Sequence, residues 1–268
     1  MISGGLMIYH YGIGRSFDIK IFYIKQIKKI YVPLWISYVV IFCIGYFVMP
    51  EKYLGASITN CIAALLALDY FSNIGLGIFA LVGEWFTTVI ILLYLLFPFL
   101  RLLFKSKYRI PITFFIFISC LMNMHFQIMS FWNGWFSITN GILYFWIGML
   151  FEYYKKQVYC RINLVFSVIL CLVLLVTNPY KLLAIDYLPT FIISVCLYFI
   201  LMNINNIKSS FIIGVNKIGY EIYLIHHRIY YWLMPIMVNR MDGIVDECVV
   251  FIILFIVIYS NFPHQLVC

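Results

Sequence analysis

The chain has 268 residues, of which 65% are hydrophobic and only 10% charged, and its mean hydropathy is +1.02. A water-soluble fold of this size has too little interior to bury so much apolar surface, so the composition excludes a soluble globular protein. The formal net charge of +8 comes from basic residues in short segments between apolar runs, which is typical of membrane topology and contact with anionic lipid and does not indicate nucleic-acid binding.

Apolar runs long enough for membrane helices follow one another along almost the whole chain. A hydrocarbon core of about 30 Å takes roughly 20 apolar residues in a helix, and helices satisfy their own backbone hydrogen bonds in lipid. The runs lie at about residues 1–13, 31–49, 84–103, 110–125, 135–152, 162–177, 182–202, 218–238 and 244–261. They predict an all-α fold, a polytopic integral membrane helical bundle of about nine spans.

One further apolar run, residues 57–81, is broken by polar residues and glycines. Asp69, Asn73, Gly75 and Gly77 interrupt it. We therefore expect an interrupted or re-entrant segment rather than a span, a form that is stable only where protein covers the backbone.

Basic residues gather in three segments, 15–29, 101–109 and 155–161, which alternate with nearly uncharged ones such as 125–134. When the interrupted run is not counted as a span, all three basic segments fall on one side of the membrane. Lysine and arginine are retained on the cytoplasmic side of short loops, so that side is expected to be cytoplasmic. The sequence thus predicts a multi-pass protein of the cell inner (plasma) membrane.

The eight cysteines show no metal-binding pattern. No C-x-x-C pair or histidine partner occurs at ligand spacing. Five of the cysteines lie inside apolar runs: Cys43, Cys61, Cys120, Cys171 and Cys196. We expect small core residues and no metal site.

The first candidate functional segment is the basic run at residues 25–35. Lys25, Lys28 and Lys29 fall on one helical face at i, i+3 and i+4. Such a face suits the phosphates of an anionic, nucleotide-bearing donor. An orientation signal with lipid headgroup contacts explains the same residues, and the sequence alone leaves both interpretations open.

The second candidate is a carboxylate beside an aromatic pair, Glu84-Trp85-Phe86, at the start of a long apolar run. In a cavity, Glu84 could bind a sugar hydroxyl or hold a proton, and Trp85 could stack on a sugar ring. Alternatively, Glu84 caps the helix, where a negative charge favours the N-terminal end of the dipole.

The third candidate is a dense polar segment late in the chain. Within about three turns of one membrane helix it holds Glu221, Tyr223, His226, His227 and Arg228. Neutral imidazole can take a proton from an attacking hydroxyl near pH 7, which makes His226 or His227 a candidate base. A hydrogen bond to a neighbouring helix is the structural alternative.

Five segments resemble, in the same order, motifs of the acyltransferase type 3 family. Residues 2–6 are similar to its I-S-G-F-L segment, and residues 25–33 to its basic K-R-x-x-R-I-x-x-P stretch. Residues 84–98 are similar to its W-F-x-x-x-x-x-x-x-Y-x-x-x-P helix. Residues 145–151 are similar to its F-x-x-G-x-x-F/L helix. Residues 219–226 are close to S-Y-x-I-Y-L-x-H. Each match is weak alone, and their order across most of the chain makes the set specific.

Members of this family are integral membrane enzymes that move acetyl or other acyl groups onto cell-surface glycans and small molecules. The resemblance implies one membrane acyltransferase-like domain over residues 1–268, no bound cofactor, acetyl-CoA as donor and a glycan or lipid-linked glycan as acceptor. It implies roles in donor binding for Lys25, Lys28 and Lys29, in the acceptor pocket for Glu84, Trp85 and Tyr223, and in catalysis for His226.

The chain departs from the family pattern in two places. Gln26 and Lys29 stand where the family usually has arginines, which reduces bidentate phosphate contact to point-charge contact. The family's first span carries an arginine and, further along, a histidine thought to be the base, whereas this chain begins in what resembles the second span. We therefore expect the domain to be N-terminally incomplete relative to the family, and His10, which follows the Ser-Gly motif, is not assigned that role.

Two rival functions stay open. A helical bundle with intramembrane Glu, His and Arg could be a glycan transporter or flippase, although the sequence contains no inverted repeat. A catalytically inactive, truncated relative of the acyltransferases is the other alternative.

Overall fold

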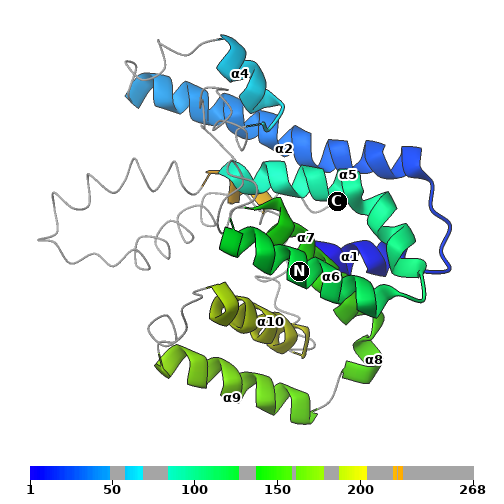
Figure 1. The fold of residues 1–268 in the computed structure, drawn as a ribbon. Helices are drawn as coiled ribbons and strands as arrows, with labels where there is room; N and C mark the ends of the chain where they lie inside the picture. Colours follow the sequence, from blue (N-terminus) through cyan, green and yellow to red (C-terminus); the bar gives the residue numbers. More distant parts are fainter. Residues whose placement is uncertain are drawn as a thin grey trace, which may run out of the picture. The chain divides into compact units, whose positions relative to one another are not determined.

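The computed structural model describes residues 1–48, 58–68, 84–126, 137–158, 161–177, 187–203, 220–221 and 223–225. Within these ranges every regular element is a helix and none is a strand, which confirms the all-α class. The helices, coloured along the chain in Figure 1, are α1 (Ile2–Tyr11), α2 (Ile19–Val48), α4 (Ile58–Leu65), α5 (Glu84–Lys105), α6 (Arg109–Phe126), α7 (Ile138–Tyr153), α8 (Lys155–Val158), α9 (Arg161–Thr177) and α10 (Tyr187–Asn203).

Most helices begin and end close to the predicted apolar runs, but α2 begins much earlier than the run predicted at residues 31–49. Its first third lies in the basic segment and combines lysines with Ile, Phe and Tyr. Phe22, Gln26, Ile30 and Leu34 are all buried and recur every four residues. This buried stripe forms one helical face through the basic segment. The helix therefore begins within the basic segment, before the fully apolar run.

The interrupted run contains the short helix α4, of eight residues. A helix of that length rises about 12 Å, less than half of the hydrocarbon core. It ends at Leu65, and Ala67 adopts a left-handed conformation (φ 56°) just beyond it. The described part of this run therefore does not span a bilayer, and the rest of the run lies outside the described residues.

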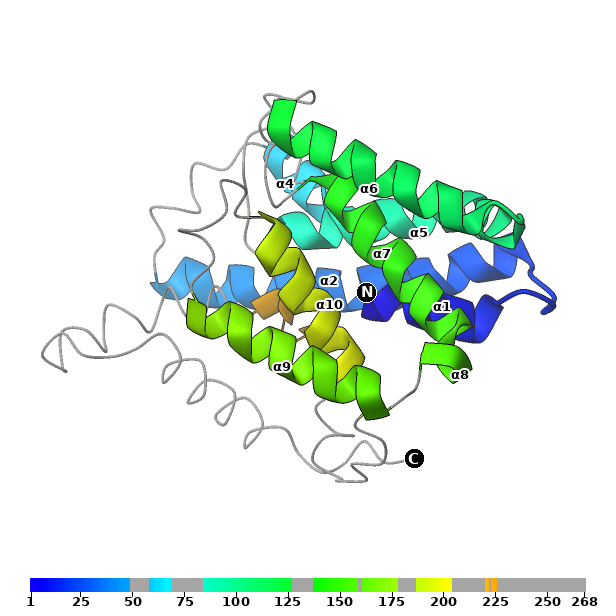
Figure 2. The same ribbon diagram turned by 60° about the horizontal axis from the view of Figure 1, so that its bottom comes forward.

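The chain divides into two compact units, the first formed by Met1–Ile19 and Leu92–Ile207, the second by Lys20–Ile91 and Lys208–Cys268. In the first unit α1 packs against α7, α6 packs against α7, and α9 lies beside α10 (Figure 2). Glycines allow the close approach of α1 to α7: a Cβ atom added to Gly4 would lie 1.9 Å from the carbonyl oxygen of Phe145.

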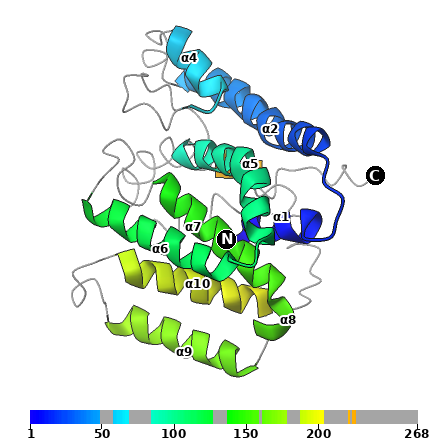
Figure 3. The same cartoon turned by 45° about the vertical axis from the view of Figure 1, so that its right-hand side comes forward.

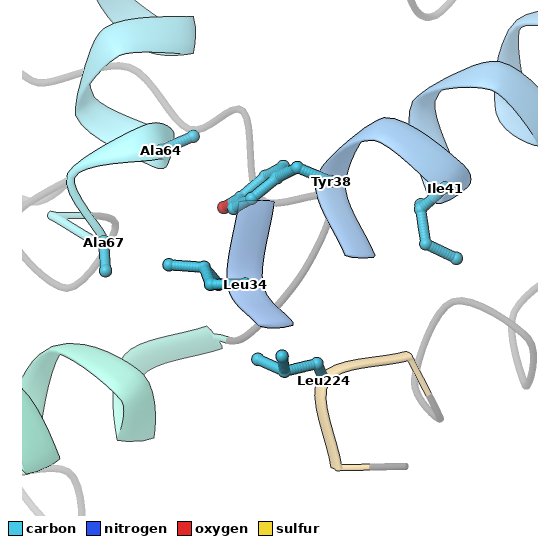
Figure 4. Packing of buried hydrophobic residues seen from close by; sticks show 6 residues of the cluster. All are labelled: Leu34, Tyr38, Ile41, Ala64, Ala67 and Leu224. Carbon is cyan, nitrogen blue, oxygen red and sulfur yellow. The ribbon is translucent and has the colours of Figure 1, made fainter. Parts of the chain in front are cut away.

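In the second unit α4 lies along α2 (Figure 3). Their contact is a small apolar core to which Tyr220 and residues 223–225 also contribute. Figure 4 shows its buried members: Leu34, Tyr38, Ile41, Ala64, Ala67 and Leu224. This core joins three parts of the chain that are distant in sequence.

Within the described residues, two helical stretches are long and apolar enough to cross a membrane, Ile19–Phe47 and Phe86–Lys105. Shorter apolar helices include Ile162–Leu174 in α9. The exposed side chains of α9 are apolar around much of its circumference, with Ile162 76% and Phe166 64% exposed. Such a surface is unfavourable in water and suits contact with lipid. The total of about nine spans stays a prediction.

Candidate functional site

The second unit brings three of the motif segments together. The ring of Tyr223 lies edge-on to the ring of Phe86, with centroids 5.1 Å apart. Leu224 packs in the same core as Leu34 and Tyr38 of α2. The segment with the Tyr-Leu-x-His element therefore meets both the start of α5 and the part of α2 around Leu34 and Tyr38.

Side chains of α2 hold the C-terminal end of α4 at this place. Trp35 Nε1 donates to the carbonyl oxygen of Leu65 (2.9 Å), and Tyr31 Oη donates to that of Leu66 (3.2 Å). Helix ends leave carbonyl groups without intrahelical partners, which is costly away from water. The two aromatic donors, one helical turn apart, satisfy them.

A threonine of α5 completes this arrangement, since Thr88 Oγ1 donates to the carbonyl oxygen of Ala67. Sequence analysis did not identify Tyr31, Trp35 or Thr88 as functional, because no spacing pattern marks a donor whose acceptor is a distant backbone oxygen. Together these contacts fix the start of α5, which carries Glu84 and Trp85.

Glu84 and Trp85 are the first two residues of α5, and Phe86 follows them. Their side chains lie outside the described part of the structure, so the choice between a helix cap and an acceptor pocket stays a prediction. The backbone position is informative because Tyr223 contacts Phe86, the next residue. The expected pocket residues Trp85 and Tyr223 thus belong to segments that touch.

Lys25, Lys28 and Lys29 lie on α2, and all three side chains are exposed. Among the described residues, none of the three forms an ion pair with a carboxylate. The rise of a helix places them about 8–14 Å along α2 from Leu34 of this core. Their ammonium groups are available for an external anion, as a donor site or a lipid-contact site both require.

Buried polar atoms of this unit that have no hydrogen-bond partner among the described residues include Gln26 Oε1, Thr87 Oγ1 and Glu221 Oε2. Gln26 is only 7% exposed and stands where the family has an arginine. Glu221 was noted in the sequence only as part of a dense polar segment. A buried carboxylate oxygen without a donor is costly, so this oxygen requires a partner beyond the described residues. His226 lies outside the described residues.

The described side chains of this arrangement supply acid–base and hydrogen-bonding chemistry. Within the described ranges no three His, Cys, Asp or Glu side chains come together as a metal site. The described groups are the Glu221 carboxylate, the Tyr223 phenol, the exposed lysine face of α2 and the start of α5. These can bind an anion and orient a hydroxyl group.

The fold and this arrangement define an apolar helical protein in which residues 223–225 meet both α2 and the start of α5. The family model for an acyltransferase domain, that of the acyltransferase type 3 family, matches residues 1–260. The chain therefore belongs to the acyltransferase type 3 family, which makes it a membrane acyltransferase in general terms. Comparisons with curated proteins and with solved structures gave no match.

Proposed function

We propose that this protein is a membrane O-acyltransferase that moves an acetyl group from acetyl-CoA to a hydroxyl of a cell-surface polysaccharide or its lipid-linked precursor. The observation that carries the proposal is the meeting of two motif segments of the family, through Tyr223 and Phe86, in a chain that the family model matches over residues 1–260. The whole of residues 1–268 is taken as one acyltransferase-like domain in the inner membrane, with about nine spans.

The proposed reaction is acyl transfer to oxygen. A base removes the proton of the sugar hydroxyl, the oxygen attacks the thioester carbonyl carbon, and oriented dipoles stabilise the oxyanion. The carbon–sulfur bond then breaks, and the CoA thiolate takes up a proton to leave as the thiol. No cofactor beyond the donor is required.

The proposed roles follow the chemistry of each residue. Lys25, Lys28 and Lys29 bind the phosphates of acetyl-CoA from the cytoplasmic side, because their exposed ammonium groups have no ion-pair partner among the described residues. Glu84, Trp85 and Tyr223 form the acceptor pocket, and His226 exchanges the proton: a carboxylate and aromatic rings suit a sugar, and imidazole titrates near neutral pH.

The donor assignment is tested by replacing all three lysines, Lys25, Lys28 and Lys29, with Gln in the full chain. Loss of three phosphate contacts should raise the apparent KM for acetyl-CoA by about fivefold or more and change kcat little. The measurement is the initial rate of labelled acetyl transfer in membranes as acetyl-CoA is varied.

A matched control removes the same charge elsewhere, with Lys20, Lys105 and Lys107 replaced by Gln; these three are also exposed. Its KM should stay within about twofold of the unmodified protein. An unchanged KM in the Lys25, Lys28 and Lys29 variant, with normal membrane insertion, would remove these lysines from the donor site. An equal rise of KM in both triple variants would show that Lys25, Lys28 and Lys29 act through general membrane electrostatics.

A further inference from the structure

The end of α4 is held by side chains of two other helices. Three consecutive backbone carbonyl groups each accept a hydrogen bond there. The carbonyl oxygens of Leu65 and Leu66 accept from aromatic donors of α2, and that of Ala67 accepts from Thr88 Oγ1 of α5. The last of these bonds joins the end of α4 to the second turn of α5.

Ala67 has a backbone conformation that is rare for a residue with a Cβ atom. Its φ is 56°, a left-handed conformation that glycine normally takes at the end of a helix. The amide groups of Ala67 and Leu68 donate back to the carbonyl oxygens of Ala64 (2.9 Å) and Ala63 (2.8 Å). A non-glycine residue keeps such a conformation only where its surroundings fix it, and residues of this kind cluster at functional sites.

Ala67 is connected to both segments that supply the proposed acceptor pocket. Its side chain is buried in the same apolar core as Leu224 (Figure 4), and its carbonyl oxygen accepts from Thr88. Thr88 follows Glu84 by four residues, so the two positions lie about one turn apart on the same face of α5. The bond from Thr88 therefore constrains the start of α5 relative to residues 223–225.

We propose that Thr88 is a positioning residue for the acceptor: through Ala67 it holds the start of α5 in register with Tyr223 and so sets the affinity for the glycan. This inference rests on the proposed function, in which Glu84, Trp85 and Tyr223 form the acceptor pocket. Recognition of a sugar by a carboxylate and aromatic rings depends on their spacing, and a displacement of about 1 Å is enough to weaken it. The Thr88 side chain is only 2% exposed, so it acts through its neighbours and not by contact with the substrate.

The test compares kinetic constants of the full-length protein in vesicles, with labelled acetyl-CoA and purified envelope polysaccharide as substrates. Thr88→Val keeps the shape of the side chain and removes the donor, and it should raise the KM for the polysaccharide about fivefold or more. The KM for acetyl-CoA should stay within about twofold, because the lysine face lies on α2, whose own bonds to the end of α4 are intact. Unfolded molecules lower the apparent kcat and leave KM unchanged, so the two KM values separate position from stability.

Two variants serve as matched controls. Thr88→Ser keeps the donor, and both of its KM values should stay within about twofold of those of the unmodified protein. Thr87→Val changes the adjacent buried threonine, whose Oγ1 has no partner among the described residues, and should behave in the same way. An unchanged polysaccharide KM in Thr88→Val would overturn the proposal, as would an equal rise of both KM values or a rise of the same size in Thr88→Ser.

A cross-linking measurement distinguishes this proposal from the proposed function. Phe86→Cys and Tyr223→Cys, introduced together, are joined by a short bis-maleimide, and peptide mass spectrometry identifies the product among those of the native cysteines. Adding Thr88→Val should lower the yield of this product by about half or more, and adding Thr88→Ser should not. Absence of acetyl transfer by the unmodified protein would overturn the proposed function, whereas equal cross-linking in the two Thr88 variants would overturn the positioning role.

Discussion

At the scale of single residues, one buried arginine organises the end of α1. Arg101 is 5% exposed, and its Nε donates to the carbonyl oxygen of Tyr11 at 2.6 Å. Its Nη2 donates to the carbonyl oxygens of Gly12 (3.3 Å) and Arg15 (2.9 Å). The guanidinium also lies over the ring of Phe17, 4.5 Å from its centroid. A cation at the C-terminal end of a helix satisfies its last carbonyls and complements its dipole.

Replacing Arg101 with Gln should therefore destabilise the protein. The shorter, neutral side chain leaves carbonyl groups unpaired, and the expected loss is about 2–4 kcal/mol in the free energy of unfolding. Unfolding in mixed micelles with increasing denaturant measures it. The exposed Lys105, one turn further along α5, is the control, and Lys105→Gln should change the value by less than about 0.5 kcal/mol. Equal stability of the two variants would show that Arg101 acts only as a topology signal.

Two adjacent threonines of α5 give an internal comparison. Both are buried, but Thr88 Oγ1 donates to the carbonyl oxygen of Ala67, whereas Thr87 Oγ1 has no partner among the described residues. Thr88→Val should cost about 1–3 kcal/mol, and Thr87→Val should be neutral or stabilising, since valine has nearly the same shape without an unpaired hydroxyl. The same unfolding measurement tests both, and the reverse order of stabilities would contradict the hydrogen-bond assignment.

At the scale of elements, the sequence predicted where most helices lie but not how they touch. The apolar runs near α5, α6 and α9 match the helices closely. A continuous apolar run is enough to predict the position of a membrane helix. The extension of α2 was missed, since its buried stripe alternates with exposed lysines. The capping of α4 was also missed. Tyr31 and Trp35 donate to backbone carbonyl oxygens about thirty residues away in the sequence, and no local sequence pattern predicts such pairs.

The contact of α1 with α7 makes an element-scale prediction. Alanine normally favours a helix over glycine by about 1 kcal/mol, yet Gly4→Ala should destabilise this protein by about 1–3 kcal/mol. Its Cβ would lie 1.9 Å from the Phe145 carbonyl oxygen, a backbone atom that moves only if α1 moves. Leu6→Ala, at an exposed position of α1, should change stability by less than about 0.5 kcal/mol. A Gly4→Ala protein as stable as the unmodified one would show that α1 and α7 do not approach closely.

At the scale of the whole molecule, composition alone predicted a helical membrane protein, and the order of weak motifs predicted the family, which the match over residues 1–260 confirms. The candidate site is only partly accessible to sequence reasoning. Tyr223 was chosen from its segment, but its contact with Phe86 depends on two segments more than a hundred residues apart. Glu221 and Gln26 were noted in the sequence, but that each has a buried polar atom without a partner among the described residues could not be predicted from it.

The proposed orientation makes a prediction at this scale. An epitope inserted after Ser106, in the exposed turn between α5 and α6, should be accessible to antibody only in permeabilised cells, because the proposal places Lys105, Lys107 and Arg109 on the cytoplasmic side. An epitope in the uncharged segment 127–134 should be accessible from outside the inner membrane. The opposite pattern would invert the topology and place the lysine face of α2 away from cytoplasmic acetyl-CoA.

The most direct measurement is transfer of labelled acetyl groups from acetyl-CoA by the purified protein in vesicles that contain envelope glycan, with no ion or voltage gradient. An acyltransferase should place label on the glycan as an alkali-labile ester and release CoA in equal amount. The His226→Ala protein, equally well inserted, should lose most of this transfer. Folded protein that transfers no label without a gradient would contradict the account and leave a transporter or an inactive relative of the family.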